Sequence, residues 1–434
     1  MRSRLLTGFM PANSTFPSGA LYYKGMDELH RSFPKNFYWG AATSAHQVGG
    51  GNCNDWTEWE KSESRIKNLE SRIKGENFRK QFPDYILKNW PSPLDTENYI
   101  SGKACDHYNR FREDFDIAKE LGHNAHRFSI EWSRIEPEEG KFDEKEIEHY
   151  REVIRALRER GVEPFVTLWH FTLPLWIAKQ GGWASRKTVD YFTRFAERIS
   201  REFKDEVVFW ITVNEPGAWA ADAYLFGIKP PARHNPFLLN RAYWNLHRAH
   251  VRAYRAMKSV NPRFEIGVAE SMEYLGGLGG IFAGYLRNFF FLHTVDDALD
   301  FIGVNYYKRA RIFGRARFAV SDMGLEIFPE GLYKVLKGAY CIFRKPIFIT
   351  ENGLADARDI KRGKFIEDHI RAVEKAIKEG VDVRGYFHWS LLDNFEWQDG
   401  FWPRFGLIEV DYRTQARKIR ESAYAYSGTI KNVS

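Results

Sequence analysis

The sequence predicts an α/β protein in which eight parallel strands close into a single-domain (β/α)8 barrel, the TIM-barrel architecture. Three observations predict it. The chain contains eight short apolar segments, helical periods separate most of them, and no glycine-rich phosphate-binding turn is present. Repeated alternation of strands and helices is typical of a parallel sheet. Eight such units without a phosphate-binding turn favour a closed barrel over an open, doubly wound sheet.

The expected strands are short and run from residue 37 to residue 388. They are Phe37–Thr43, Asn124–Ile130, Glu163–Trp169, Val207–Val213, Glu265–Ala269, Phe301–Tyr307, Pro346–Thr350 and Arg384–His388. The expected helices are Arg110–Leu121, Glu144–Arg160, Thr188–Phe203, Asn240–Val260 and Ile366–Glu379. A chain of 434 residues could hold two or three domains, but barrels of this class run long as single domains. Because no linker or repeat interrupts the pattern, we expect one barrel domain over residues 33–434.

Two stretches fall outside the alternation. Residues 1–32 contain Pro11, Pro17, Gly19 and Gly25 and little periodicity, so we expect an irregular N-terminal extension there. Residues 52–103 are rich in charge and contain three prolines. This composition predicts a long loop with short helices.

Residues 275–292 (LGGLGGIFAGYLRNFFFL) are apolar over much of their length. Five glycines and Arg287 interrupt the segment, which argues against a membrane span. We expect a barrel helix with a glycine-rich lead-in, because buried helices are the commoner explanation of apolar runs. The alternative is a mobile apolar lid beside the site, through which a membrane contact would be possible.

Charge and cysteine content argue against several classes of partner. The chain has 64 Lys and Arg against 57 Asp and Glu, and the two signs interleave, as in Arg151–Arg160. Nucleic-acid binders instead gather positive charge on one face, so no nucleic-acid partner is expected. Cys53, Cys105 and Cys341 form no CxxC pair, so neither a metal site nor a disulfide framework is expected. The early apolar run is also too short for a secretory signal, so we expect a cytoplasmic protein. The sequence does not indicate an oligomeric state.

Two carboxylates directly follow apolar strands. Strand four leads into Asn214-Glu215-Pro216, and strand seven leads into Glu351-Asn352-Gly353. The active site of a barrel lies at the carboxyl ends of its strands. Two carboxylates that face each other there can hydrolyse a glycosidic bond, one as acid and one as nucleophile, when they are roughly 5–5.5 Å apart. Either one alone could equally be a salt-bridge partner or a helix cap.

Seven motifs, spread from Phe33 to Ser422, also resemble a known family. They are FPKNFYWGAATSAHQ (33–47), HRFSIEWSRIEP (126–137), TLWHFTLPLW (167–176), TVNEP (212–216), FIGVNYY (301–307), ITENG (349–353) and HWSLLDNFEWQDGFWPRFGL (388–407). In this order they resemble glycoside hydrolase family 1, the retaining β-glucosidases and β-galactosidases. The resemblance implies a (β/α)8 barrel that hydrolyses a small-molecule β-glycoside or oligosaccharide without a cofactor.

The resemblance also implies roles at the catalytic centre. Glu215 would be the general acid and then the general base, and Glu351 would be the nucleophile. Arg127 would hold Glu351 by a charge-assisted hydrogen bond, and Tyr307 would donate its phenolic hydrogen to the same carboxylate. Asn214 would bind the 2-hydroxyl of the sugar, a contact that strengthens in the transition state. Asn305 stands two residues before Tyr307 in one strand, so both side chains can point into the barrel.

Five further positions match those that bind the terminal sugar in the family. They are Gln47, His170, Trp389, Glu396 and Trp397. A glutamine can both donate and accept, which suits neighbouring hydroxyls. Glu396 would accept hydrogen bonds from two hydroxyls, typically O4 and O6, and should repel a phosphate. Together with Trp397 it indicates a closed end that fits one terminal sugar.

The sequence departs from the family pattern in three places. Phe171 stands where tryptophan is common, which removes an indole N–H donor to the sugar, and Val48 stands where glutamate is usual. The region from Ala269 to Phe301 is also shorter than in most members. These changes leave open the choice between glucose and galactose and the width of the aglycone side.

Three rivals to an exo-acting hydrolase remain. A transglycosylase on the same scaffold, with an apolar or lipid-linked acceptor, is suggested by the apolar segment 275–292. A non-catalytic sugar-binding barrel would have no need of both carboxylates together with Arg127. An endo-acting glycanase would need an open cleft.

Overall fold

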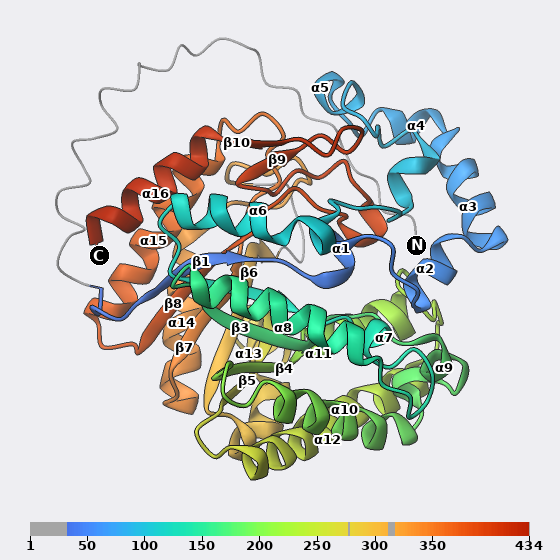
Figure 1. Cartoon of the computed structure of the whole chain (residues 1–434). Helices are drawn as coiled ribbons and strands as arrows, with labels where there is room; N and C mark the ends of the chain where they lie inside the picture. The colour runs from blue at the N-terminus through green and yellow to red at the C-terminus, as the bar shows by residue number, and fades with distance from the viewer. Residues whose placement is uncertain (1–32, 277, 311–316, 434) are drawn as a thin grey trace.

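The computed structural model describes residues 33–276, 278–310 and 317–433, and the extension predicted for residues 1–32 lies outside them. Eight parallel strands form a closed barrel in chain order, with β1 hydrogen-bonded to β8 (Figure 1). The strands are β1 Tyr38–Ala42, β2 Ala125–Ser129, β3 Glu163–Trp169, β4 Phe209–Asn214, β5 Glu265–Leu275, β6 Phe301–Ala310, β7 Ile347–Asn352 and β8 Val383–Trp389. The predicted (β/α)8 barrel is confirmed.

Two strands are longer than the sequence pattern predicts. β5 continues to Leu275 and β6 to Ala310, and the two remain paired to their ends. Of their added residues, Met272 is buried and the others are polar or half-buried, so they carry no apolar run that could have indicated a strand. The extra length extends the β5–β6 ribbon beyond the carboxyl ends predicted for these strands.

The register between neighbouring strands shifts at the carboxyl ends of β4, β6 and β7. The shifts fall between Ile211 and Asn214, between Val304 and Asn305, and between Ile349 and Asn352. Such irregularities re-aim the side chains that follow them. They fall at the positions where the sequence predicts the catalytic residues.

The five predicted helices are present, with ends shifted by at most four residues. They are α6 His107–Glu120, α8 Glu144–Glu159, α10 Lys187–Glu202, α12 Pro236–Val260 and α15 Arg362–Lys378. Local capping explains two of the starts. The Asp143 carboxylate accepts hydrogen bonds from the first backbone N–H groups of α8. Asn235 does the same for α12, which has Pro236 at its first position, where a missing N–H costs nothing.

The remaining elements connect these units. Residues 52–103 form the expected loop with short helices, α2 Asp55–Glu60, α3 Glu63–Ile73, α4 Glu76–Arg79, α5 Asp84–Leu87 and η3 Thr96–Tyr99. Other short turns of helix are α1 Ala45–Gly49, α7 Trp132–Ile135, α9 Leu175–Lys179, η4 Gly182–Ala184, α11 Pro216–Ala221, η5 Asp222–Phe226, η6 Asp296–Ala298 and η7 Trp397–Asp399. The sequence pattern did not predict α14 Pro329–Phe343, α16 Glu421–Val433 or the hairpin of β9 Ile408–Val410 and β10 Arg417–Ile419.

The apolar segment 275–292 is mostly helical, as expected. It forms the body of α13 (Leu278–Val295), which packs against β5 and α12. Phe282, Leu286 and Phe290 lie on one side of this helix and are exposed. No helix in the described part of the chain is both long and apolar enough to cross a membrane.

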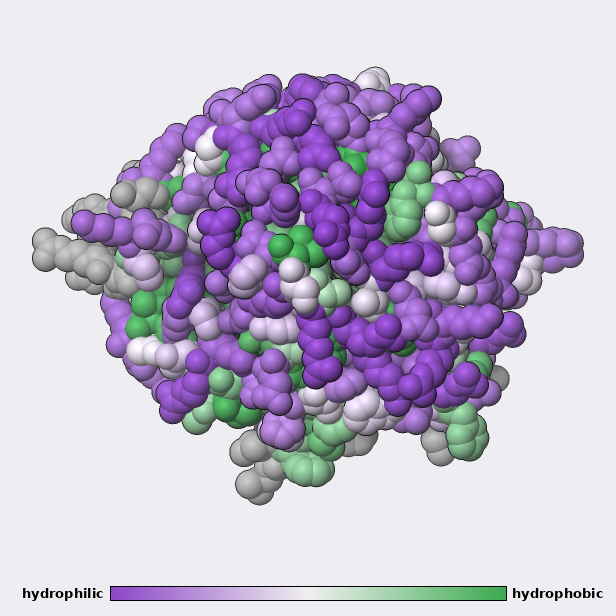
Figure 2. All heavy atoms as spheres, turned by 60° about the horizontal axis from the view of Figure 1, so that its bottom comes forward, coloured by the Kyte–Doolittle hydropathy of each residue, from purple (hydrophilic) through white to green (hydrophobic). Residues whose placement is uncertain are grey.

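The lower part of the barrel interior is filled with aromatic rings. Phe165 and Phe209 stack with their centroids 4.3 Å apart, and Tyr38, Phe348 and Phe387 pack against them. These rings close the barrel below, so a ligand can enter only from the carboxyl ends of the strands. Outside, the face shown in Figure 2 is mainly hydrophilic, with small hydrophobic patches.

Candidate active site

A cavity of about 250 Å³ opens at the carboxyl ends of the barrel strands. Nine of the eleven residues predicted for the site line it. They are Gln47, His170, Asn214, Glu215, Tyr307, Glu351, Trp389, Glu396 and Trp397. Arg127 and Asn305 are buried and contact members of this set through hydrogen bonds. A second cavity, about 660 Å³, is lined by Trp59 and Tyr224 among others and by none of the eleven.

Glu351 lies at the end of β7 and is held through both of its oxygens. Arg127 donates from Nη1 to Oε1 at 2.6 Å, and the Tyr307 hydroxyl donates to Oε2 at 2.6 Å. Burial raises the pKa of Glu351 to about 7, with Arg127 opposing the shift and the charge of Glu215 adding to it. Burial and the nearby Glu351 raise the pKa of Tyr307 well above its usual value, so its hydroxyl remains a donor.

Glu215 sits at the turn between β4 and α11. Its φ of +46° places a non-glycine residue in the left-handed region, and Pro216 follows at the first position of the helix. Its backbone N–H donates to Ala269 O at 2.7 Å, and its Oε1 accepts a hydrogen bond from Asn305 Nδ2 at 2.9 Å. Such conformations persist where the surroundings enforce them, often in active sites.

A hydrogen-bond network links the two glutamates beneath the cavity. Arg127 Nη2 and Asn305 Nδ2 both donate to Asn214 Oδ1, at 2.7 and 3.2 Å. Thr350 Oγ1 donates to Asn305 Oδ1 at 2.7 Å, which fixes the orientation of that amide. One buried network therefore positions the residues that hold Glu215 and Glu351.

The far end of the cavity is built from Gln47, Glu396 and three rings. Gln47 Nε2 donates to Glu396 Oε2 at 3.3 Å. The ring of His170 lies nearly parallel to Trp389 and Trp397, at interplanar angles of 16° and 14°. Flat apolar walls with polar groups at the edge can accept a sugar ring and its hydroxyls.

Titration at this end differs from that of exposed groups. Burial lowers the pKa of His170 well below its usual value, so the ring is neutral at pH 7. Its Nε2 lies 3.3 Å from Asn214 Nδ2, while Nδ1 has no hydrogen-bond partner among the described residues. Burial raises the pKa of Glu396 to about 8, with the charges of Asp399 and Glu351 adding to the shift and Lys229 opposing it.

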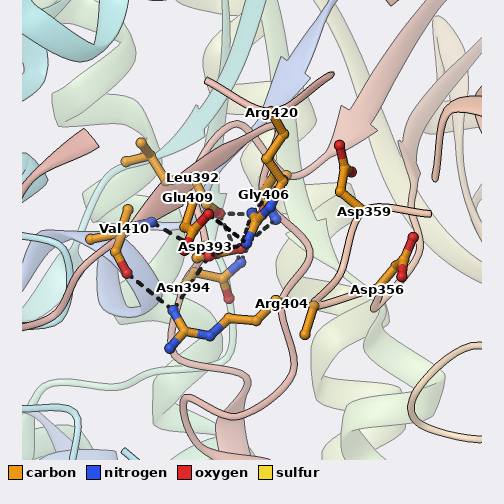
Figure 3. Close-up of polar contacts among 12 residues, drawn as sticks. Asp356, Asp359, Leu392, Asp393, Asn394, Arg404, Gly406, Glu409, Val410 and Arg420 are labelled. Atoms are coloured by element: carbon orange, nitrogen blue, oxygen red, sulfur yellow. Dashed lines mark hydrogen bonds and ion pairs between the residues drawn. The ribbon is translucent and has the colours of Figure 1, made fainter. Parts of the chain in front are cut away.

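The loop that carries Glu396 and Trp397 is anchored by Asp393, which the sequence pattern did not indicate (Figure 3). Arg420 donates from Nη1 to Oδ1 at 2.8 Å and from Nη2 to Oδ2 at 3.0 Å, and Arg404 approaches Oδ2 at 3.3 Å. Burial would raise the pKa of Asp393, but these two arginines lower it below its usual value. Asp393 and Arg404 lie within the motif 388–407, but Arg420 is 27 residues beyond Asp393 and outside every motif, so the pairing could not be predicted from local pattern.

The cavity lining includes further residues that were not predicted to act there, among them Lys229 and Phe171. Lys229 lines the cavity although no motif contains it. Phe171, which the sequence identified only as a departure, lies beside Trp397 with ring centroids 5.0 Å apart. Its φ of +79° is again in the left-handed region. Val48, the other departure, is buried in the hydrophobic core.

Comparisons with known proteins agree with this geometry. The model of the family "Glycosyl hydrolase family 1" matches residues 29–277 and 309–434. Between the two matched stretches, residues 278–308 are left unmatched, and they include α13 and most of β6.

Individual relatives cover nearly the whole chain. "Beta-glucosidase A" of Thermotoga maritima is 32% identical over 93% of this chain and 98% of its own length. "Beta-galactosidase" of Sulfolobus acidocaldarius is 30% identical over 91% of this chain and 94% of its own. The solved β-glucosidase of Thermotoga maritima in complex with deoxynojirimycin superposes with a TM-score of 0.79 at 32% identity, covering 92% of this chain and 99% of that one. This chain therefore belongs to glycosyl hydrolase family 1 and is a glycoside hydrolase.

Proposed function

We propose that the protein is a retaining exo-β-glycosidase that releases terminal β-linked glucose or galactose through a covalent glycosyl-enzyme. One observation carries the proposal: Glu215 and Glu351 line the same cavity and are bridged by the network of Arg127, Asn214 and Asn305. A salt-bridge or capping role for either glutamate would not need this arrangement.

In the first step, Glu215 gives its proton to the glycosidic oxygen while a Glu351 oxygen attacks the anomeric carbon. The bond to the leaving group breaks, and the sugar becomes esterified to Glu351. In the second step, Glu215 takes a proton from water, and the resulting oxygen attacks the same carbon and frees the Glu351 carboxylate. Arg127 and Tyr307 orient the nucleophile and favour its ionised form.

The far end of the cavity is proposed to bind the terminal sugar. Gln47, His170 and Glu396 would contact hydroxyls, Trp389 and Trp397 would contact the ring face, and Asn214 would bind the 2-hydroxyl. The unpartnered Nδ1 of His170 supports this, because a buried polar atom normally finds a partner and a sugar hydroxyl can supply one.

The relatives support the choice of sugar. Their names include both a β-glucosidase and a β-galactosidase, and solved relatives hold deoxynojirimycin, castanospermine or a galacto-hydroximolactam. Both glucosides and galactosides are therefore proposed as substrates. We expect the reaction to need no metal or organic cofactor, because the two carboxylates supply all the proton transfer and the nucleophile.

A panel of aryl β-glycosides tests the proposal. The wild type should hydrolyse the β-glucoside or the β-galactoside, and proton NMR should show the β-anomer of the sugar as the first product. Glu351→Ala should abolish turnover, and Glu215→Ala should slow substrates with poor leaving groups most and be partly rescued by azide. First release of the α-anomer would contradict the double displacement, and wild-type activity in Glu351→Ala would contradict the nucleophile.

A transglycosylase is the second candidate, because Phe282, Leu286 and Phe290 form an exposed apolar stripe on α13. Product analysis with and without an alkyl alcohol separates the two. Hydrolysis that dominates in water and continues without acceptor supports the hydrolase, whereas turnover that requires the alcohol supports the transglycosylase.

The cellular location and the domain boundaries also remain proposals. The cytoplasm is supported by three cysteines that form no disulfide, with the buried Cys105 thiol hydrogen-bonded to Asp393 O. A single domain over residues 33–434 is supported by the hydrophobic core, which continues from Phe37 to Ile430.

A further inference from the structure

Lys229 carries a charged amino group in the wall of the active-site cavity, at the end where the terminal sugar is proposed to bind. It follows η5, in the turn that leads to α12, and its side chain is only 7% exposed. Its Nζ lies 3.9 Å from the ring centroid of Phe171 and 5.9 Å from that of Trp397. The ammonium therefore faces two of the walls that enclose the sugar.

This ammonium has one carboxylate partner at ion-pair distance in the described part of the chain. Asp222 Oδ2 lies 3.2 Å from Nζ. An ammonium has three N–H donors, and the face of Phe171 is a weak acceptor compared with an oxygen. Burying an ammonium costs free energy when some of its N–H donors have no acceptor, unless a further oxygen accepts from them. The cavity beside Lys229 is the place from which a ligand oxygen can supply that acceptor.

The neighbouring groups indicate what kind of oxygen this is. The carboxylates of Glu396 and Asp399 are close enough to interact electrostatically with Lys229. With Asp222 paired to the ammonium and Asp399 nearby, an additional anion would meet negative charge, whereas a neutral hydroxyl carries no charge to be repelled. Phe171 also lacks the indole N–H that tryptophan would offer, so the Lys229 ammonium above its ring is the donor available there.

We propose that Lys229 is a sugar-binding residue whose ammonium donates a hydrogen bond to a ring hydroxyl of the terminal sugar, with Asp222 holding it in position. The inference rests on the proposed function, because it assumes that a glycoside occupies this cavity. In this proposal Lys229 favours sugars that carry one particular hydroxyl, and it takes no part in proton transfer.

The test compares p-nitrophenyl β-D-glucoside with its 3-deoxy, 4-deoxy and 6-deoxy analogues. Lys229→Met should lower kcat/KM for the parent by about ten- to a hundredfold, the effect of a hydrogen bond from a charged group. The same substitution should change kcat/KM by less than about threefold for the one analogue that lacks the hydroxyl bound by Lys229. Lys229→Gln, whose amide can still donate, should regain part of the loss on every substrate that keeps this hydroxyl.

A matched control is Lys258→Met, at a largely buried lysine that is not among the residues lining this cavity and that pairs with Asp300 at 2.7 Å. It should keep the wild-type order of the four substrates. An equal loss on all four in Lys229→Met, or no loss, would overturn the proposal, and so would a wild type that prefers p-nitrophenyl β-glucuronide. If Lys229→Met does not fold, the same pattern is required of Lys229→Gln. A wild type that is inactive on every glycoside would refute the proposed function. An active wild type, combined with a Lys229 variant that loses the same factor in kcat/KM on all four substrates, would refute only the role of Lys229.

Discussion

The Tyr307 hydroxyl donates to Glu351 Oε2 across 2.6 Å, while Arg127 occupies the other oxygen of the same carboxylate. The carboxylate is therefore fixed on two sides before any substrate binds. Preorganised donors of this kind lower the cost of forming charge and of orienting a nucleophile.

Tyr307→Phe should reduce kcat/KM on an aryl β-glucoside by roughly ten- to a hundredfold, because it removes one hydrogen bond to a charged group and little volume. Steady-state kinetics with the fold checked by circular dichroism measures this. Tyr333→Phe is the control, since its hydroxyl bonds an exposed glutamate on the outer helices. Equal activities of the two variants would contradict the positioning role.

On the acidic side of its pH–rate profile, the wild type should lose activity at an unusually high pH. As the proposed nucleophile, Glu351 must be ionised to attack, and burial together with Glu215 raises its pKa to about 7 despite Arg127. As the pH falls below that value, the ionised fraction falls, and kcat/KM of the free enzyme should fall with it. Rates measured from pH 4 to 9 should give an apparent pKa near 7, a property of the coupled pair. A limb near 4.5 would contradict this.

Arg127→Met should move that acidic limb to still higher pH. Arg127 lowers the pKa of Glu351, so its removal leaves burial and the charge of Glu215 unopposed. The same change should destabilise the fold by about 3–5 kcal/mol at pH 8, because it leaves a buried carboxylate without its cation. Denaturant unfolding and a pH–rate profile test both, with the exposed Arg371→Met as control. An acidic limb with the same apparent pKa as the wild type would contradict the role of Arg127 in lowering the pKa of Glu351.

The barrel and the placement of the two glutamates at its cavity could be predicted because the local sequence indicates both. Each strand is an apolar run, and Glu215 and Glu351 follow two of these runs directly. The helix α14 was missed although its buried residues recur at helical spacing, because the two glycines within it weaken the local helix signal. The continuation of β5 and β6 was missed because a half-exposed ribbon has no apolar pattern.

The supporting residues could not be predicted for a different reason. Lys229 reaches the cavity only through the turn after η5, and nothing in the sequence around it indicates a pocket. Asp393 contacts Arg420, which lies 27 residues later in the chain, because the β9–β10 hairpin between them brings the two together. Contacts of this kind depend on tertiary folding, whereas motifs and periodicity report local structure.

The Asp393 pair gives a stability prediction with a defined dependence on pH. The pKa of Asp393 is lower in the folded state than its ordinary value of 3.8. A carboxyl of this kind contributes stability that is present above its unfolded pKa and lost as the pH falls through its folded pKa. Asp393→Asn should therefore reduce the free energy of unfolding by about 3–5 kcal/mol at pH 7, because it leaves Arg420 and Arg404 buried without their carboxylate.

The same variant should differ less from the wild type as the pH falls below about 3.8, where the carboxyl of the unfolded wild type begins to take up a proton. Denaturant midpoints at pH 7 and pH 3 measure the difference, with Asp382→Asn, from an exposed pair, as control. Because Asp393 anchors the loop that carries Glu396 and Trp397, KM for the glycoside should also rise at pH 7 while the variant is still folded. An unchanged KM beside a large loss of stability would show that this loop is held by its other contacts, such as the Gln47–Asn394 hydrogen bond.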